Sequence, residues 1–139
     1  MRPQGLPWPW ASRARPKPLP PRQALGRRSE ELARRHLAAL GYVVEKTNAR
    51  FPVGEIDIVA RDGQTLCFVE VRSASSEAWG GPLASITDRK RRRLIRAAQW
   101  YLARLRALPE EIRFDVVAVT WTGGVPAVEL IRGAFDATP

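Results

Sequence analysis

The sequence predicts a mixed-sheet α/β domain whose elements follow the order α-β-β-β-α-β-β. Two segments carry apolar residues at helical spacing, and five shorter segments carry the alternating or continuous apolar runs of strands. The chain has 139 residues and 45% hydrophobic content, which is enough for one domain with its own core. We therefore expect a three-layer core in which helices flank a single mixed sheet.

The first 22 residues differ in composition from the rest of the chain. Residues 1–22 contain seven of the twelve prolines, five basic residues and no acid. Proline removes backbone donors and blocks helix, so we expect an extended or disordered tail. This tail either adds non-specific attraction for phosphate or is an inert extension, and residues 23–139 form the predicted domain.

A first helix is predicted over residues 27–40. Its apolar positions follow helical spacing: Leu32, Ala33, Leu37 and Leu40. Two acid–base pairs at i, i+4 are expected on its surface: Glu30 with Arg34, and Glu31 with Arg35.

Three strands are predicted next, at residues 42–47, 54–60 and 65–72. The Asp62-Gly63 pair between the last two predicts a hairpin turn. After a Gly- and Ser-rich loop, the capping-box pattern Ser85-Ile-Thr-Asp88 predicts a second helix that ends at Ala107. Its apolar stripe should pack on the sheet and comprises Leu94, Ala97, Ala98, Tyr101, Leu102 and Leu105. The last two strands are predicted at residues 113–120, in the centre of the sheet, and 125–131.

The charge balance favours a polyanionic partner. Lys and Arg number 23 against 14 Asp and Glu, which gives a net charge of +9 and a pI near 11.1. Such a field attracts nucleic acid, although a merely soluble basic protein is the alternative. No run approaches the ~18 apolar residues of a membrane span, and the N-terminus lacks the apolar core of a secretory signal. We expect a cytoplasmic protein without membrane contact.

The cysteine and histidine content limits the metal chemistry. Cys67 is the single cysteine, so the chain forms no intramolecular disulfide, and His36 is the single histidine. These two residues do not make a zinc cluster. Any metal must therefore be held by oxygen ligands.

The predicted hairpin gathers acidic side chains on one face. With Asp62-Gly63 as a two-residue turn, Glu55 lies opposite Glu70, and Asp57 lies diagonal to Glu70 at a backbone separation of ~7 Å. Arg72 follows on the same face. The other face is expected to be an apolar core surface of Ile56, Ile58, Cys67, Val69 and Val71.

Carboxylates this close repel one another, and a divalent cation with oxygen ligands relieves the conflict. Mg²⁺ or Mn²⁺ suits such a site because it takes one or two carboxylates, keeps several waters and accepts phosphate oxygens. The alternative is a solvated charged face in which Glu55 or Glu70 pairs with Arg50, Arg61 or Arg72.

A basic run opens the second predicted helix. Five successive cations near a helix N-terminus oppose its macrodipole, an arrangement that favours an external anion. A solvated helix face is again the alternative. The residues we expect to contact a nucleic-acid backbone are Arg50, Arg89, Lys90, Arg92, Arg93 and Arg96.

An ordered series of motifs over residues 26–120 resembles the bacterial YraN-type family. The series consists of GRRSEELARRHLAALGY, GEIDIVARDG, FVEVR, a GGP loop, a basic helix with AAQWYL, and RFDVVAV. The fold of that family is similar to those of archaeal Holliday-junction resolvases and other PD-(D/E)-x-K nucleases. The resemblance therefore implies a restriction-endonuclease-like core and a Mg²⁺-dependent endonuclease acting on DNA, with branched or junction DNA as a candidate substrate.

The resemblance also implies a role for each matching residue. Asp57 and Glu70 match the two acids of the nuclease motif and would hold the metal with the Val71 carbonyl. Glu55 is an additional metal-ligand candidate from the hairpin register. Glu30 matches an acid of the first helix that orients water or a second metal.

Arg72 takes the position that usually holds lysine in this motif. A guanidinium that stays protonated cannot act as a general base, although it can still clamp a phosphate. Two alternatives to a nuclease stay open: a nucleic-acid-binding protein of the same fold without catalysis, and a protein-interaction domain. Resolvase-like relatives act as two-fold dimers, so the resemblance also implies a homodimer.

Overall fold

The computed structural model describes residues 21–78 and 80–137, so residues 1–20 of the predicted tail lie outside the described part. The described residues form two α-helices, a short 3-10 helix and five strands, in the predicted order. Their bounds are α1 Pro21–Ala39, β1 Val43–Phe51, β2 Gly54–Asp62, β3 Thr65–Ser75, η1 Pro82–Ser85, α2 Asp88–Leu102, β4 Glu111–Thr122 and β5 Val125–Phe135.

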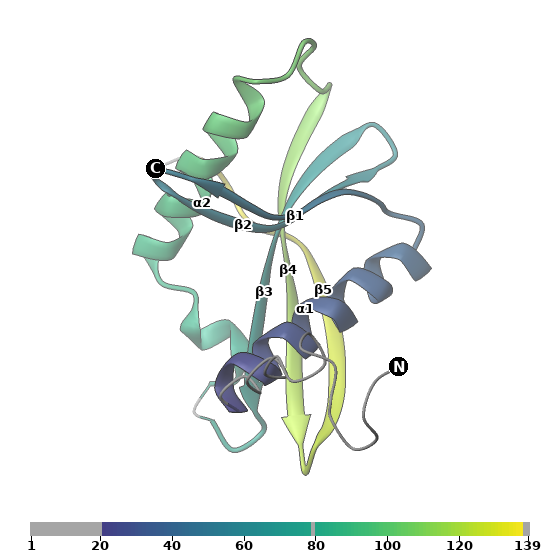
Figure 1. Ribbon diagram of the computed structural model, residues 1–139, viewed down its shortest axis with the longest axis vertical. Coiled ribbons are helices and arrows are strands. Elements are labelled where there is room, and N and C mark those ends of the chain that lie inside the picture. The colour runs from purple at the N-terminus through teal and green to yellow at the C-terminus, as the bar shows by residue number, and fades with distance from the viewer. Residues whose placement is uncertain (1–20, 79, 138–139) are drawn as a thin grey trace, which may run out of the picture.

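The strands form one mixed sheet in the order β1-β2-β3-β4-β5. Neighbouring strands are antiparallel except β3 and β4, which run parallel. Because a tight turn cannot join parallel neighbours, the chain crosses from β3 to β4 through α2. Figure 1 shows α1 and α2 on different sides of the sheet, with β1 and β2 swung away from the direction of β3 to β5. The predicted mixed α/β fold is confirmed.

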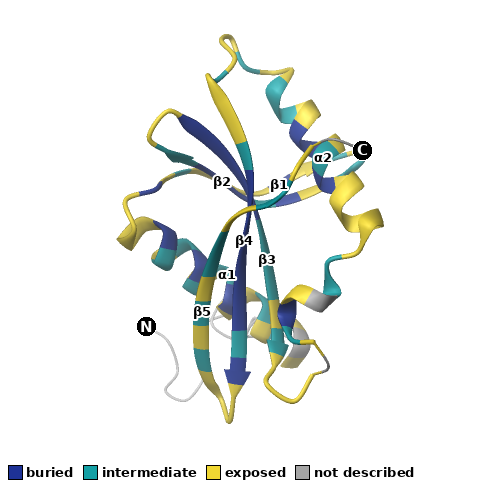
Figure 2. Ribbon diagram, turned by 180° about the vertical axis from the view of Figure 1, so that it is seen from behind, coloured by how far each residue is buried: buried dark blue, intermediate teal, exposed yellow. Residues whose placement is uncertain are grey.

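Buried residues form one cluster under each helix, and Figure 2 shows the buried stretches of the central strands between them. The cluster under α1 joins Leu37 to Ile58 and Val69, whereas the cluster under α2 joins Leu94 to Phe68. Because helices cover both faces of the sheet, β3 and β4 carry continuous apolar runs. The predicted apolar stripe packs on the sheet as expected: Leu94, Ala97 and Ala98 belong to the α2 cluster, and Tyr101, Leu102 and Leu105 pack against it, with Leu105 just beyond the end of the helix. Neither described α-helix is long and apolar enough to cross a membrane.

Helix α1 begins earlier than the sequence pattern predicts. It starts at Pro21 and so includes the last two residues assigned to the tail. Proline is tolerated in the first turn, where its missing N–H would have no helical partner. Arg34 pairs with Glu31 at 2.5 Å instead of with Glu30, while the predicted Glu31–Arg35 pair is confirmed at 3.1 Å. Glu30 is thereby left to face the sheet.

Helix α2 begins later than predicted, and its N-cap is a different residue. The side chain of Thr87 accepts the backbone N–H of Lys90 at 3.3 Å. The predicted capping box at Ser85 is therefore wrong, because that residue ends η1 and its hydroxyl donates to the Pro82 carbonyl at 2.7 Å. The helix also ends at Leu102, five residues before the predicted end, where backbone bonds tighten into turns.

The hairpin between β2 and β3 turns one residue later than predicted. Its central residues are Gly63 and Gln64, closed by the facing pair Asp62 and Thr65. Gly63 has a φ of 62°, and Gln64 has no positive φ. A positive φ at only the first central position is the pattern of a type II′ turn, which requires glycine there.

The later turn changes which acids face each other. Ile58 faces Val69 in the last ladder pair, and the next position on each strand brings Asp57 level with Glu70. The prediction that Glu55 faces Glu70, with Asp57 diagonal to it, is therefore wrong. Because the register is shifted by two residues, the alternation of side chains along the strands is unchanged.

One predicted core residue packs on the other side of the sheet. Three members of the predicted apolar face lie in the α1 cluster and a fourth packs against it: Ile58, Cys67, Val69 and Val71. Ile56 belongs instead to the α2 cluster, so its predicted side is wrong. The facing strand β1 contains Asn48 with a φ of 51°, between two ladder pairs. A left-handed residue turns the strand locally, which rotates the outer part of the hairpin.

The corrected turn gives a stability prediction with a matched control. Gly63→Ala should lower the free energy of unfolding by about 1–2 kcal/mol, because open space surrounds the site and only the positive φ opposes a Cβ. Gly26→Ala, also in open space but within α1, should raise it by up to about 1 kcal/mol. Urea unfolding measures both, and a neutral Gly63→Ala would contradict the type II′ turn.

Candidate metal centre

The candidate centre lies where strands β2 and β3 part. Their ladder ends at Ile58 and Val69, and Asp57 and Glu70 occupy the next position on each strand. Just beyond the ladder, the backbone N–H of Val71 donates to Oδ2 of Asp57 at 2.8 Å. A carboxylate therefore satisfies a backbone donor that a neighbouring strand would otherwise satisfy.

The carboxyl groups of Asp57 and Glu70 lie close enough to perturb each other's ionisation. Burial, followed by the charge of Glu70, raises the pKa of Asp57 to about 8, against the opposing effect of the Val71 N–H. Burial also raises the pKa of Glu70, opposed by the charge of Arg72. Because two adjacent half-buried acids do not both ionise readily, the pair retains a proton at neutral pH when no cation is bound.

Two positively charged side chains, Arg72 and Lys90, lie near Glu70 on the α2 side of the sheet. Nη1 of Arg72 lies 3.3 Å from Oε1 of Glu70, and Nε of Arg72 donates to Oγ of Ser85 at 2.7 Å. The charge of Lys90 also lowers the pKa of Glu70, and its Nζ donates to the Ser85 carbonyl at 3.0 Å. Glu70 thus has nearby positive charge, whereas Asp57 is surrounded by an N–H and other acids.

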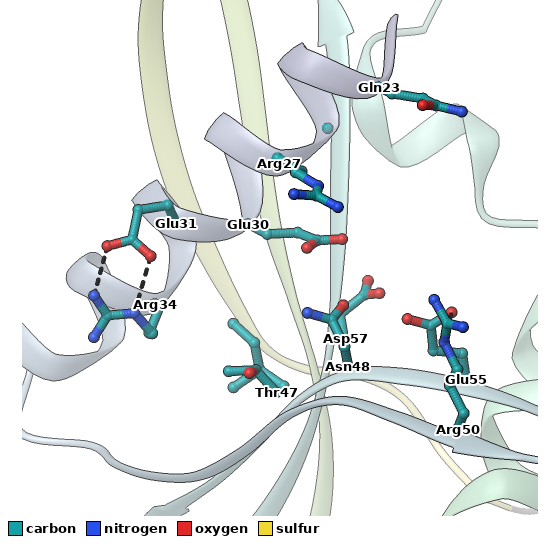
Figure 3. A pocket seen from close by; sticks show the side chains of 12 residues that line it. Gln23, Arg27, Glu30, Glu31, Arg34, Thr47, Asn48, Arg50, Glu55 and Asp57 are labelled. Atoms are coloured by element: carbon teal, nitrogen blue, oxygen red, sulfur yellow. Dashed lines mark hydrogen bonds and ion pairs between the residues drawn. The ribbon is translucent and has the colours of Figure 1, made fainter. Parts of the chain in front are cut away.

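On the α1 side, Asp57 opens onto a cavity of about 830 Å³ between α1 and the β1–β2 hairpin. Glu30 from α1 and Glu55 from β2 also line it. Figure 3 shows Glu30, Asp57 and Asn48 directed toward one another from α1, β2 and β1. Burial and then the charge of Glu55 raise the pKa of Glu30, while a hydrogen bond from Asn48 lowers it. Three predicted site acids therefore share one cavity, and Glu70 joins them through Asp57.

The oxygen donors of this centre fit a cation that keeps much of its water. Across residues 21–78 and 80–137, no three Asp, Glu, His or Cys side chains converge as a metal-binding group. Mg²⁺ does not need such a cage, because one or two carboxylates and several waters complete its octahedron. Asp57 and Glu70 supply those carboxylates, and a cation there would take the place of their shared proton. Val71 adjoins Asp57, so its predicted role as a carbonyl ligand stays a prediction.

The predicted site residues are divided between the two sides of the sheet. Those that line the α1-side cavity are Glu30, Arg50, Glu55 and Asp57. Those that contact one another or Ser85 on the α2 side are Glu70, Arg72 and Lys90. The centre therefore spans the sheet at the place where its strands part, instead of lying on one face as the sequence predicts.

The basic residues of α2 are all exposed and border several cavities. Lys90 lines a small pocket beside Glu70, Arg92 lines a cavity beside β5, and Arg93 lines one with Arg50. Their predicted contact with a nucleic-acid backbone stays a prediction.

The sequence patterns do not identify three residues that lie at the site. Arg27 and Asn48 line the α1-side cavity beside Glu30, and Ser85 holds Arg72. Only Asn48 carries a weak local signal, because asparagine adopts the left-handed conformation more readily than most residues. The other two become site residues through tertiary packing.

A second buried acid shows how a structural carboxylate differs from Asp57. Asp115 is fully buried and accepts hydrogen bonds from Nε of Arg113 at 2.7 Å, the N–H of Gly133 at 2.9 Å and the hydroxyl of Tyr42 at 3.1 Å. An arginine compensates its charge directly. The contacts of Asp57 leave its charge without such a partner, and buried groups of this kind cluster at functional sites.

Comparison with known proteins identifies relatives along most of the chain. The profile of the uncharacterised protein family UPF0102 matches residues 29–119. A UPF0102 protein of Desulfosudis oleivorans is 49% identical over 116 residues, which cover 84% of this chain and 93% of the relative. UPF0102 proteins of an Anaeromyxobacter species and of Clostridium kluyveri are 44% and 36% identical, covering 83% and 81% of this chain and 86% and 93% of the relatives.

Asp57→Asn is expected to stabilise the metal-free protein at about pH 8 by on the order of 1 kcal/mol. The pKa of Asp57 rises from 3.8 to about 8 on folding, so the folded state binds this proton more tightly than the unfolded state. The contribution of Asp57 to stability therefore falls as the pH increases through that interval.

The measurement is urea unfolding in EDTA at about pH 6 and about pH 8. Asparagine keeps an oxygen that can accept the Val71 N–H and removes the titration. The advantage of the variant should increase with pH, and an advantage independent of pH would show that Asp57 does not titrate in this interval.

Proposed function

This chain belongs to the UPF0102 family, the YraN-type family that the motif series predicts, and we propose that it is a metal-dependent nuclease hydrolysing phosphodiester bonds in DNA. In this proposal the α/β/α layers form a restriction-endonuclease-like core, with Mg²⁺ or Mn²⁺ at Asp57 and Glu70. The observation that carries the proposal is the pair of adjacent, half-buried carboxyl groups of Asp57 and Glu70, with Asp57 lining a large cavity.

The side chains around this pair have distinct parts in the proposed reaction. A bound divalent cation would supply Lewis acidity and lower the pKa of a coordinated water. Asp57 and Glu70 would hold that cation, and Glu55 would add negative charge at the cavity wall. Glu30 would orient the attacking water across the cavity by accepting a hydrogen bond, and Asn48 would keep Glu30 in place.

Arg72 would act on the phosphate and not on the water. An arginine guanidinium stays protonated in proteins and so cannot remove a proton from water at neutral pH. The contacts with Glu70 and Ser85 hold it beside the proposed cation, where it could stabilise developing charge on phosphate oxygens. Arg72 is thus assigned to transition-state stabilisation.

A nucleic-acid-binding protein without catalysis is the second candidate, favoured by arginine at the position usually held by lysine. A protein-interaction domain is the third. Steep loss of DNA binding with rising salt supports a phosphate-binding surface, whereas insensitivity to salt favours protein contacts. The proposal also includes a homodimer, since a two-fold partner suits the two strands of a junction.

Mg²⁺ is expected to raise the melting temperature of the wild-type protein. A free Mg²⁺ concentration of 100 times its Kd would stabilise the folded state by about 2.7 kcal/mol. Because the cation must replace the shared proton of Asp57 and Glu70, the increase should be larger at about pH 8 than at about pH 6.

Differential scanning fluorimetry with and without Mg²⁺ measures this effect independently of activity. Asp57→Asn combined with Glu70→Gln should abolish it, while Glu129→Gln, which removes an exposed acid of β5, should not. Equal increases in all three proteins would place the cation elsewhere.

Asp57→Ala and Glu70→Gln are each expected to reduce Mg²⁺- or Mn²⁺-dependent cleavage of DNA by at least ~100-fold, because both remove a proposed metal ligand. Arg72→Lys should cleave as fast as the wild type or faster. Labelled branched, flapped, duplex and single-stranded DNA are the substrates, and Glu129→Gln is the control. Cleavage that survives Asp57→Ala would come from a contaminant or another site and would contradict the assignment.

A further inference from the structure

We propose that the cavity between α1 and the β1–β2 hairpin receives one unpaired strand of nucleic acid, and that this strand binds only when a divalent cation is present. This inference rests on the proposed function for the location of the cation. It replaces α2, which the sequence favours, with the α1-side cavity as the place where phosphates are bound.

The size and position of the cavity limit what can enter it. Its volume of about 830 Å³ is that of a pocket for a few nucleotide units. Asp57 is largely covered and is reached between α1 and the hairpin (Figure 3). An unpaired strand suits such a recess because its nucleotides rotate separately, whereas the stacked bases of a duplex cannot adapt to its walls.

Two arginines at this cavity are available for phosphate. The side chain of Arg50 is 83% exposed and its Nε lies 3.9 Å from Glu55, a loose pair that a ligand can displace. Arg27 is exposed on α1 close to Glu30. Arg34 also lines the cavity, but its guanidinium is already occupied by Glu31 at 2.5 Å.

The charges of these residues make phosphate binding conditional on a cation. Setting aside the Arg34–Glu31 pair, the cavity presents two arginines, Arg27 and Arg50, against three acids. Even with Asp57 uncharged the two arginines only balance Glu30 and Glu55, whereas one added divalent cation makes the balance positive. The cation therefore supplies the net positive charge that a phosphate needs in this cavity.

A second cavity continues the path toward α2. Arg50 and Glu55 line both cavities, and the second, of about 500 Å³, adds Phe51 and Arg93. A strand that leaves the first cavity past Arg50 therefore meets one further cation, Arg93, while Phe51 packs against the α2 cluster under the Arg104 guanidinium.

The test measures binding of a fluorescein-labelled single-stranded DNA and of the matching blunt duplex, in Ca²⁺ and in EDTA, by fluorescence anisotropy. Ca²⁺ is the probe because it binds oxygen ligands and keeps waters. The wild type should bind the single strand in Ca²⁺ at least about tenfold more tightly than the duplex, and about tenfold more tightly than in EDTA. Equal binding to both DNAs, or binding independent of Ca²⁺, would overturn the proposal.

Two charge-matched double variants locate the strand. Arg27→Ala with Arg50→Ala should weaken single-strand binding about tenfold and reduce the salt slope by about 1.4, at ~0.7 per lost phosphate contact. Arg89→Ala with Arg92→Ala removes the same charge from α2 and should change the affinity less than about threefold. The reverse order would place the strand on α2. All four arginines are exposed, so melting temperatures should stay close to that of the wild type.

Measurements of binding and of cleavage can support or contradict the strand-binding proposal and the nuclease proposal separately. Cation-dependent binding that requires Arg27 and Arg50, without any cleavage, would support the cavity and contradict the nuclease. Cleavage that requires Asp57 but prefers duplex DNA and tolerates loss of both arginines would support the nuclease and contradict the cavity.

Discussion

The separation of β2 from β3 after Ile58 and Val69 is the constraint on which the candidate centre depends. Parting strands leave backbone donors without a ladder, and burial makes such donors costly unless another acceptor replaces the strand. Asp57 provides that acceptor for the N–H of Val71. Asp57 is therefore held where the strands part by the N–H that their parting leaves free. Glu70 lies beside it on the neighbouring strand.

The helices complete this opening from opposite sides. Helix α1 places Glu30 above Asp57 because its apolar face, centred on Leu37, packs against the sheet. The crossover that parallel pairing of β3 and β4 requires brings η1 and α2 to the other side, where Ser85 holds Arg72. The topology thus brings residues from distant parts of the chain together around Asp57 and Glu70.

Local patterns in the sequence were enough for the order of elements, the apolar stripe of α2, the family and the meeting of Asp57 with Glu70. The register was not predictable, because Asp62-Gly63 and Gly63-Gln64 both place glycine in a two-residue turn and differ only in which central position it takes. The cavities that Lys90, Arg92 and Arg93 border were also not predictable, because tertiary packing decides which residues lie opposite each face of a helix. Sequence spacing alone does not reveal that α1 and the β1–β2 hairpin enclose a cavity.

Because the two acids are reached from different faces of the sheet, neither helix alone encloses the centre. A chain in which α1 has not docked would lack Glu30, and one in which α2 has not docked would lack the support that Ser85 gives Arg72. The centre is therefore complete only when both helices have docked, and under the proposed nuclease function the activity would be confined to molecules that have finished folding.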